Sequence, residues 1–180
     1  MGKSITIILL SLFVSNSFAN TTGRQVRQVR DGSSVIGVGI LKGDKVKDGF
    51  TLHYLSLNRE LDNDFESGFG FAINYFDVLN LDDGFKGTFF SYSPQFALNY
   101  YLNDGPVQII IGGAAHLVFG SERINNQTSN FFIGPQLKET FGIKLADTIC
   151  IKAGGFQLWH LGSEILPSDF GLTAGFDISF

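Results

Sequence analysis

The closing segment of the chain, residues 170–180, reads FGLTAGFDISF and alternates strictly between two kinds of residue. Counting back from the C-terminus, every second residue is apolar: Phe180, Ile178, Phe176, Ala174 and Leu172. The residues between them are small or polar. Because successive side chains of a β-strand point to opposite faces, this pattern predicts a strand with one apolar and one polar face.

This segment resembles the terminal strand of bacterial outer-membrane β-barrels, in which a last aromatic residue and alternating apolar positions form the assembly signal. The resemblance implies that Phe180 engages the barrel assembly machinery. The alternative is the last strand of a soluble, lipocalin-like barrel.

The N-terminus favours export of the chain. Lys3 precedes a largely apolar core at residues 5–14, and Ser17 and Ala19 supply the small residues that a signal peptidase reads. We therefore predict a signal peptide at residues 1–19, cut after Ala19, and a periplasmic, arginine-containing tail at residues 20–33. No later segment has eighteen consecutive apolar residues, and a membrane-spanning chain without such helices must be a closed barrel.

Composition agrees with a barrel and excludes several other classes. The chain has 19 Phe and 22 Gly, and its net charge of −4 argues against nucleic-acid binding. The single cysteine, Cys150, cannot form an internal disulfide and has no partner at metal-ligand spacing. We expect no metal and no cofactor.

Residues 34–180 contain eight strand candidates and form one predicted domain. Pro94 interrupts the fourth candidate, where we expect a bulge or a kink. The candidates cover residues 34–42, 50–58, 68–76, 88–101, 107–119, 131–145, 149–159 and 170–180.

The lengths of the connections indicate the architecture. Very short turns follow the fourth and sixth candidates, at residues 103–105 and 146–148. Longer polar connections follow the odd-numbered candidates, at residues 43–49, 77–87, 120–130 and 161–169, and residues 59–67 are an exception on the short side. The pattern predicts an all-β, eight-stranded antiparallel up-and-down transmembrane β-barrel of the OmpA/OmpX-like size, with both termini periplasmic.

Charged residues test this prediction, because charges within the strands should point away from lipid. Lys138, Lys144, Lys152 and Asp177 share the inward parity of their strands, and so do His53 and His116. Glu139 falls on the lipid-facing parity and breaks the rule. An eight-stranded barrel is only wide enough for its own side chains, so we expect a packed polar interior and no open pore.

The second half of the chain also resembles the lipid A 3-O-deacylase (PagL-like) family of eight-stranded outer-membrane barrels. The matching residues are Pro94, Tyr100–Tyr101, Gly112–Gly113–Ala114, SNFFIG at residues 129–134, and Trp159–His160. In that family the strand ends in His-Xaa-Ser-Asn, with the histidine as general base, the serine as nucleophile and a later acid orienting the histidine.

Here the motif reads His160-Leu161-Gly162-Ser163, so Gly162 stands at the nucleophile position. The resemblance carries over only His160: Ser163 stands at the Asn position, and the acid position falls near Thr173, where Asp169 and Asp177 are the nearest carboxylates. The candidate catalytic residues of such an enzyme are therefore His160, Ser163 and Asp169. Because the nucleophile position is lost, we expect an envelope protein that acts through its loops or structurally, in contact with outer-membrane lipid and lipopolysaccharide. The alternatives are a lipid A ester hydrolase and a carrier of small apolar molecules, which would need an opening through the wall.

Overall fold

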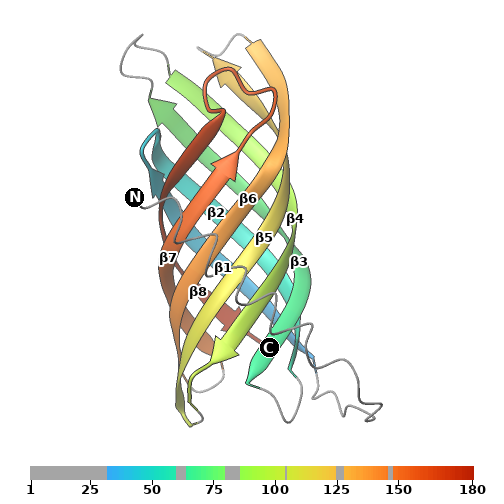
Figure 1. The fold of residues 1–180 in the computed structure, drawn as a ribbon, viewed down its shortest axis with the longest axis vertical. Coiled ribbons are helices and arrows are strands. Elements are labelled where there is room, and N and C mark those ends of the chain that lie inside the picture. Colours follow the sequence, from blue (N-terminus) through green and yellow to red (C-terminus); the bar gives the residue numbers. More distant parts are fainter. Residues whose placement is uncertain (1–31, 60–63, 80–85, 104, 125–127, 146–147) are drawn as a thin grey trace, which may run out of the picture.

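A computed structural model describes residues 32–59, 64–79, 86–103, 105–124, 128–145 and 148–180 of the 180-residue chain. The predicted signal peptide and most of the predicted tail lie outside these residues. The described residues form eight strands that wind around one barrel (Figure 1). The strands are β1 (Ser33–Gly43), β2 (Val46–Arg59), β3 (Phe65–Leu79), β4 (Lys86–Tyr101), β5 (Val107–Ile124), β6 (Thr128–Leu145), β7 (Ile149–Trp159) and β8 (Ser168–Ser179).

Each strand pairs antiparallel with the next one along the chain, and β1 closes the barrel by pairing with β8. The closure continues past β8, because Phe180 and Ser34 exchange two backbone hydrogen bonds of 2.9 and 3.0 Å. The predicted fold class is therefore confirmed. Within the described residues, no helix is long and apolar enough to cross a membrane.

The strands extend further than predicted at the end of the barrel where β1 meets β2. The predicted connection at residues 43–49 is wrong, because only residues 44–45 separate β1 from β2. The carboxylate of Asp169 explains the tight turn: it accepts hydrogen bonds from the backbone N–H groups of Asp44, Lys45 and Val46 at 2.8–3.2 Å.

The sequence predicts a bulge or a kink at Pro94, and the pairing of the strands shows no bulge there. Pro94 pairs with Phe71 of β3, and the pairings Tyr92–Phe119 and Gln95–His116 on the β5 side keep one register across the proline. The proline therefore interrupts the pairing with β5 without shifting it. The structure instead places an irregularity between Val46 and Asp48 of β2.

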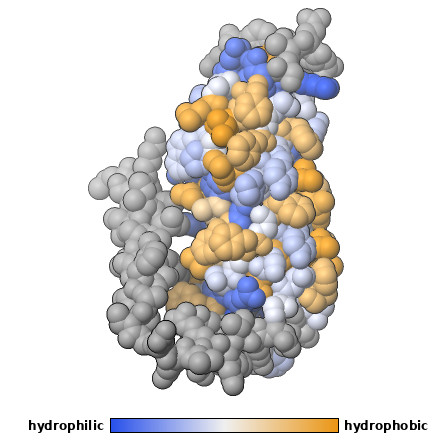
Figure 2. Space-filling model, turned by 90° about the vertical axis from the view of Figure 1, so that its right-hand side faces the viewer, coloured by the Kyte–Doolittle hydropathy of each residue, from blue (hydrophilic) through white to orange (hydrophobic). Residues whose placement is uncertain are grey.

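The two faces of the wall differ sharply in polarity. Large apolar side chains are exposed on the outer face of every strand, among them Ile40, Phe50, Phe69, Phe90, Leu117, Phe141, Ile151 and Phe176. Figure 2 shows apolar side chains spread over the visible wall, with a hydrophilic patch at its upper end. The predicted alternation is confirmed, including the outward position of Phe71 and the burial of Asn74.

Side chains pack the interior in layers. An apolar cluster built around Phe76, Phe89, Phe132 and Leu166 lies toward the end that carries the β7–β8 connection. Polar and charged side chains occupy the middle, and a smaller cluster containing Tyr101, Ile110 and Cys150 lies toward the end where β1 begins and β8 ends. This arrangement positions the candidate site at the first of these two ends.

Candidate functional site

His160 follows β7 directly and turns into the barrel. Its side chain is only 2% exposed and is surrounded by aromatic rings: the centroids of Phe132, Phe76 and Phe89 lie 4.2, 6.1 and 6.3 Å from that of the imidazole. Burial among these rings lowers the pKa of His160 from its ordinary 6.5 to about 4, although a hydrogen bond with the backbone of Leu166 acts in the opposite direction. His160 is therefore neutral at pH 7, and its Nδ1 atom has no hydrogen-bond partner among the described residues.

Ser163 lies in the β7–β8 connection, and its hydroxyl contacts a buried carboxylate. It donates a hydrogen bond to Glu122 of β5, a residue with 0% exposure, and accepts one from the backbone N–H of Leu166 at 2.9 Å. Glu122 also accepts a hydrogen bond from the backbone N–H of Glu164 at 2.8 Å. Together these bonds tie the connection to the inner wall and hold Leu166 in the apolar cluster.

Asp169 lies at the start of β8, where it serves the neighbouring turn. Besides the three N–H groups of residues 44–46, it accepts a hydrogen bond from the N–H of Phe170 at 2.9 Å. Its two oxygens are thus directed at backbone amides of the β1–β2 turn and of its own strand. Through these contacts Asp169 anchors the β1–β2 turn to the start of β8.

The three sequence-predicted residues therefore have separate partners. In the described structure the Ser163 hydroxyl is bonded to Glu122, and the Asp169 carboxylate is bonded to the turn at residues 44–46. Triad catalysis needs the base in hydrogen-bond reach of the nucleophile and the acid behind the base. The contacts seen here do not assemble that chain of groups.

Gly162 has a conformational reason to be glycine. Its φ of +89° lies in a region that side-chain-bearing residues rarely adopt. A Cβ atom built there would also lie 2.9 Å from the carbonyl oxygen of Phe131. A serine at the family's nucleophile position would thus be strained on this backbone.

The middle of the barrel holds an ionic cluster centred on Asp177. Its carboxylate lies 2.7 Å from Nζ of Lys152 and 3.0 Å from Nε2 of His53. His116 is buried next to Ser93, with 3.2 Å between Nδ1 and the hydroxyl oxygen. The inward positions predicted for Lys152, Asp177, His53 and His116 are confirmed, and these groups fill the interior.

Two buried carboxylates, Glu122 and Glu66, lie outside the strands predicted from the sequence. Glu122 was assigned to a connection, although the inward parity of β5 continues through it. Glu66 was also assigned to a connection, yet it accepts hydrogen bonds of 2.9 Å from both Asn99 and Tyr101, and the Arg59 guanidinium lies 4.2 Å from the Tyr101 ring. Extending the period-two count beyond the apolar stretch would have found both. Among the described residues, no group of His, Cys, Asp and Glu side chains could hold a metal ion.

Comparison with solved structures identifies the kind of barrel. Neisserial surface protein A superposes with a TM-score of 0.55 at 17% identity, covering 84% of this chain and 99% of that one. The outer membrane enzyme PagL gives 0.51 at 11% identity, covering 80% and 98%. A major outer membrane protein from Thermus thermophilus gives 0.51 at 10% identity, covering 84% and 100%. The chain has the fold of small eight-stranded outer-membrane β-barrels.

At these identities the likeness concerns the fold. No protein-family model and no curated protein matches the chain. The neighbours include an enzyme and proteins whose names state no activity, which agrees with the general rule that one fold carries many functions. Function must therefore be argued from the residues of this chain.

Proposed function

We propose that the protein is a non-catalytic integral protein of the bacterial outer membrane, acting through its extracellular connections or as a structural component of the envelope. The observation that carries this proposal is the polarity of the wall. Every strand exposes large apolar side chains outward, while Lys138, Asp177 and Glu122 are buried inside. Such a surface suits hydrocarbon, and a membrane-facing sheet must be closed to satisfy its backbone.

The proposal includes an orientation and partners. The start of β1 and Phe180 lie at the same end of the barrel. We assign this end to the periplasm, after removal of the signal peptide. The exposed Phe180 side chain is available to the assembly machinery, and the outer wall contacts membrane lipid and lipopolysaccharide. The connection at residues 161–167 then faces the cell exterior.

Because the barrel interior is filled with side chains, we infer that the protein acts through its outer surface and does not transport molecules through the barrel. Phe89 and Phe132 are completely buried in one layer, and the ion pair of Lys152 with Asp177 occupies the next. Eight strands enclose little more than their own side chains. Recognition or packing by the outer surface is thus the activity that this geometry supports best.

A lipid A ester hydrolase is the alternative suggested by the PagL-like resemblance. It would require the Ser163 hydroxyl to leave Glu122, where it satisfies a fully buried carboxylate, and to reach the His160 ring. Leaving Glu122 with fewer hydrogen bonds has a cost of about 1–3 kcal/mol. We therefore expect no deacylation.

Mass spectrometry of lipid A tests the choice between these functions. Cells with and without the protein should contain the same lipid A species, and the variants His160→Ala and Ser163→Ala should change nothing. Loss of one acyl chain that depends on the protein, and that disappears in either variant, would replace the proposal with the hydrolase.

A further inference from the structure

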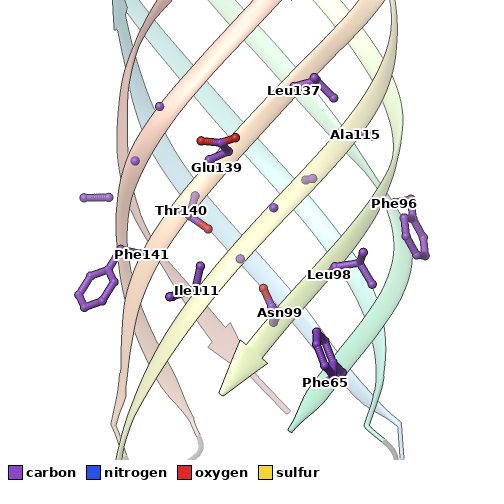
Figure 3. Close-up of a pocket in the computed structure, with 16 residues that line it drawn as sticks. Phe65, Phe96, Leu98, Asn99, Ile111, Ala115, Leu137, Glu139, Thr140 and Phe141 are labelled. Carbon is purple, nitrogen blue, oxygen red and sulfur yellow. The ribbon is translucent and has the colours of Figure 1, made fainter. Parts of the chain in front are cut away.

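A groove crosses the outer wall of the barrel over β5, β6 and β7, and residues of β3 and β4 line one end of it. Its volume is about 420 Å³. The floor is one row of directly paired residues, Gly113 on β5, Glu139 on β6 and Gly155 on β7. Figure 3 shows the Glu139 carboxylate between the side chains that flank this row. Cavities of this size are in the range that proteins use for small ligands.

The sides of the groove are apolar. Two rows of paired residues lie on either side of the floor. The row on one side contains Phe96, Ala115 and Leu137, and the row on the other side contains Ile111, Phe141 and Ala153. Aromatic and aliphatic side chains thus flank a floor in which Glu139 stands between two glycines, and Leu98 of β4, which pairs with Gly113, closes one end of the row. A groove of this composition fits a hydrocarbon chain.

Glu139 is an unusual residue for this surface. Other outward-facing charges on the described strands, such as Lys42, Asp77 and Arg123, lie within two residues of a strand end. Glu139 lies well inside β6, and its Oε1 atom is buried without a hydrogen-bond partner in the described structure. A carboxylate in apolar surroundings requires a donor, and the described protein surface supplies none for this oxygen.

The two flanking glycines leave space that the barrel itself does not require. A Cβ atom added at Gly113 or Gly155 would meet only one atom at 3.5 or 3.6 Å, which is an ordinary contact. At Gly154 and Gly134, by contrast, a Cβ atom would lie 1.8 and 1.7 Å from a backbone oxygen. Gly113 and Gly155 thus keep the groove open on both sides of the carboxylate.

We propose that this groove binds a single-chain lipophilic amine, with the alkyl chain between the apolar rows and the ammonium group on Glu139. An ammonium offers three hydrogen-bond donors and a positive charge, which complement a carboxylate that only accepts. One alkyl chain fits between the two apolar rows of the groove, whereas the broad wall of another barrel would bridge the groove and leave the Glu139 carboxylate without a cation. The site is separate from the loop end to which the proposed function is assigned.

Titration of the purified, folded full-length chain in non-ionic detergent with dodecylamine, followed by native mass spectrometry, tests the proposal. We expect saturable binding of one molecule. Glu139→Gln should weaken binding about tenfold or more, because it removes a charge-assisted bond. Gly113→Leu and Gly155→Leu should abolish binding, whereas Ser121→Leu, on the same outer face of β5 but outside the groove, should not.

Several results would overturn the proposal. These are unchanged binding by Glu139→Gln, equally tight binding of dodecanoic acid or of methyl dodecanoate, and a folded barrel that binds no amine. A dimer that Glu139→Gln converts to a monomer would make the groove a protein interface instead. All of these measurements use purified, folded protein in detergent. Their outcomes therefore do not depend on where the protein resides in the cell.

Discussion

The environment of His160 has a direct consequence for stability. The imidazole is packed between aromatic rings at centroid distances of 4.2–6.3 Å, and the pKa of His160 is lowered to about 4. A group whose pKa is lower in the folded than in the unfolded chain is protonated first in the unfolded chain. For a histidine, this favours unfolding as the pH falls below its ordinary value.

We therefore predict that the free energy of unfolding decreases between pH 6.5 and pH 4, by up to about 3 kcal/mol from His160 alone. Below pH 4 this contribution levels off, because both states are protonated. Denaturant titrations of the refolded barrel across this range measure the slope. His160→Leu should flatten it, and a slope that is the same in this variant would contradict the assignment.

Asp169 permits a second prediction at the scale of single residues. Its carboxylate accepts the N–H groups of residues 44–46, so Asp169→Ala removes the acceptor of Lys45 and Val46, whereas the Asp44 N–H keeps the carbonyl of Phe170 at 3.2 Å. We expect a loss of about 1–3 kcal/mol in unfolding free energy and faster proteolysis at the β1–β2 turn. Asp44→Ala, which changes an exposed side chain of the same turn, is the matched control and should have little effect.

At the scale of the strands, the alternation of faces is the property to test. Phe71 of β3 faces outward, so Phe71→Arg should cost roughly 2–4 kcal/mol if this part of the wall lies near the middle of the hydrocarbon. Asp77→Arg, on the same face of β3 but next to its end, should be nearly neutral. Refolding titrations into lipid vesicles compare the two variants, and a neutral Phe71→Arg would contradict the lipid-facing assignment.

The centres of the strands could be predicted from the sequence, but their ends could not. Phe69, Phe71 and Ile73 alternate with small residues, and such a pattern specifies a strand without reference to any partner. Asp48 and Glu122 interrupt the apolar alternation and resemble loop residues. They are in strands because of tertiary contacts, for Glu122 binds Ser163 and the turn before Asp48 is held by Asp169.

In the candidate site, too, features set by local alternation could be predicted from the sequence and features set by tertiary contacts could not. The inward position of His160 follows from parity along β7, because His160 lies eight residues after Lys152, which the sequence predicts to point inward. The pairing of Ser163 with Glu122 joins residues 41 positions apart, and no local pattern specifies such a contact. The positive φ angle of Gly162 likewise depends on how the connection folds against β6, and the local sequence does not specify it.

For the molecule as a whole, closure of the barrel depends on β8 and the residue after it. The Phe180 backbone pairs with Ser34 of β1, and its side chain is 72% exposed. We predict that deleting Phe180 lowers the amount of folded, heat-modifiable barrel in outer-membrane fractions. The deletion removes both the backbone hydrogen bonds to Ser34 and the terminal aromatic side chain. Phe180→Tyr should assemble normally. If deletion leaves assembly unchanged, Phe180 has no part in it.

The lipid-facing position of the outer wall is best tested by spin labels placed singly at residue 69 and at residues 71–76 of β3, because a Cβ atom at Gly68 or Gly70 would lie 2.1 or 1.8 Å from a backbone oxygen. The labels are introduced into Cys150→Ser protein, which removes the one native thiol, and are read in intact outer membranes. We predict that labels at Phe69, Phe71, Ile73 and Tyr75 are accessible to oxygen and shielded from a water-soluble nickel chelate. Labels at the even-numbered positions should be shielded from both reagents. Access of the chelate to the odd-numbered positions, or the absence of alternation, would contradict a barrel whose outer wall lies in lipid.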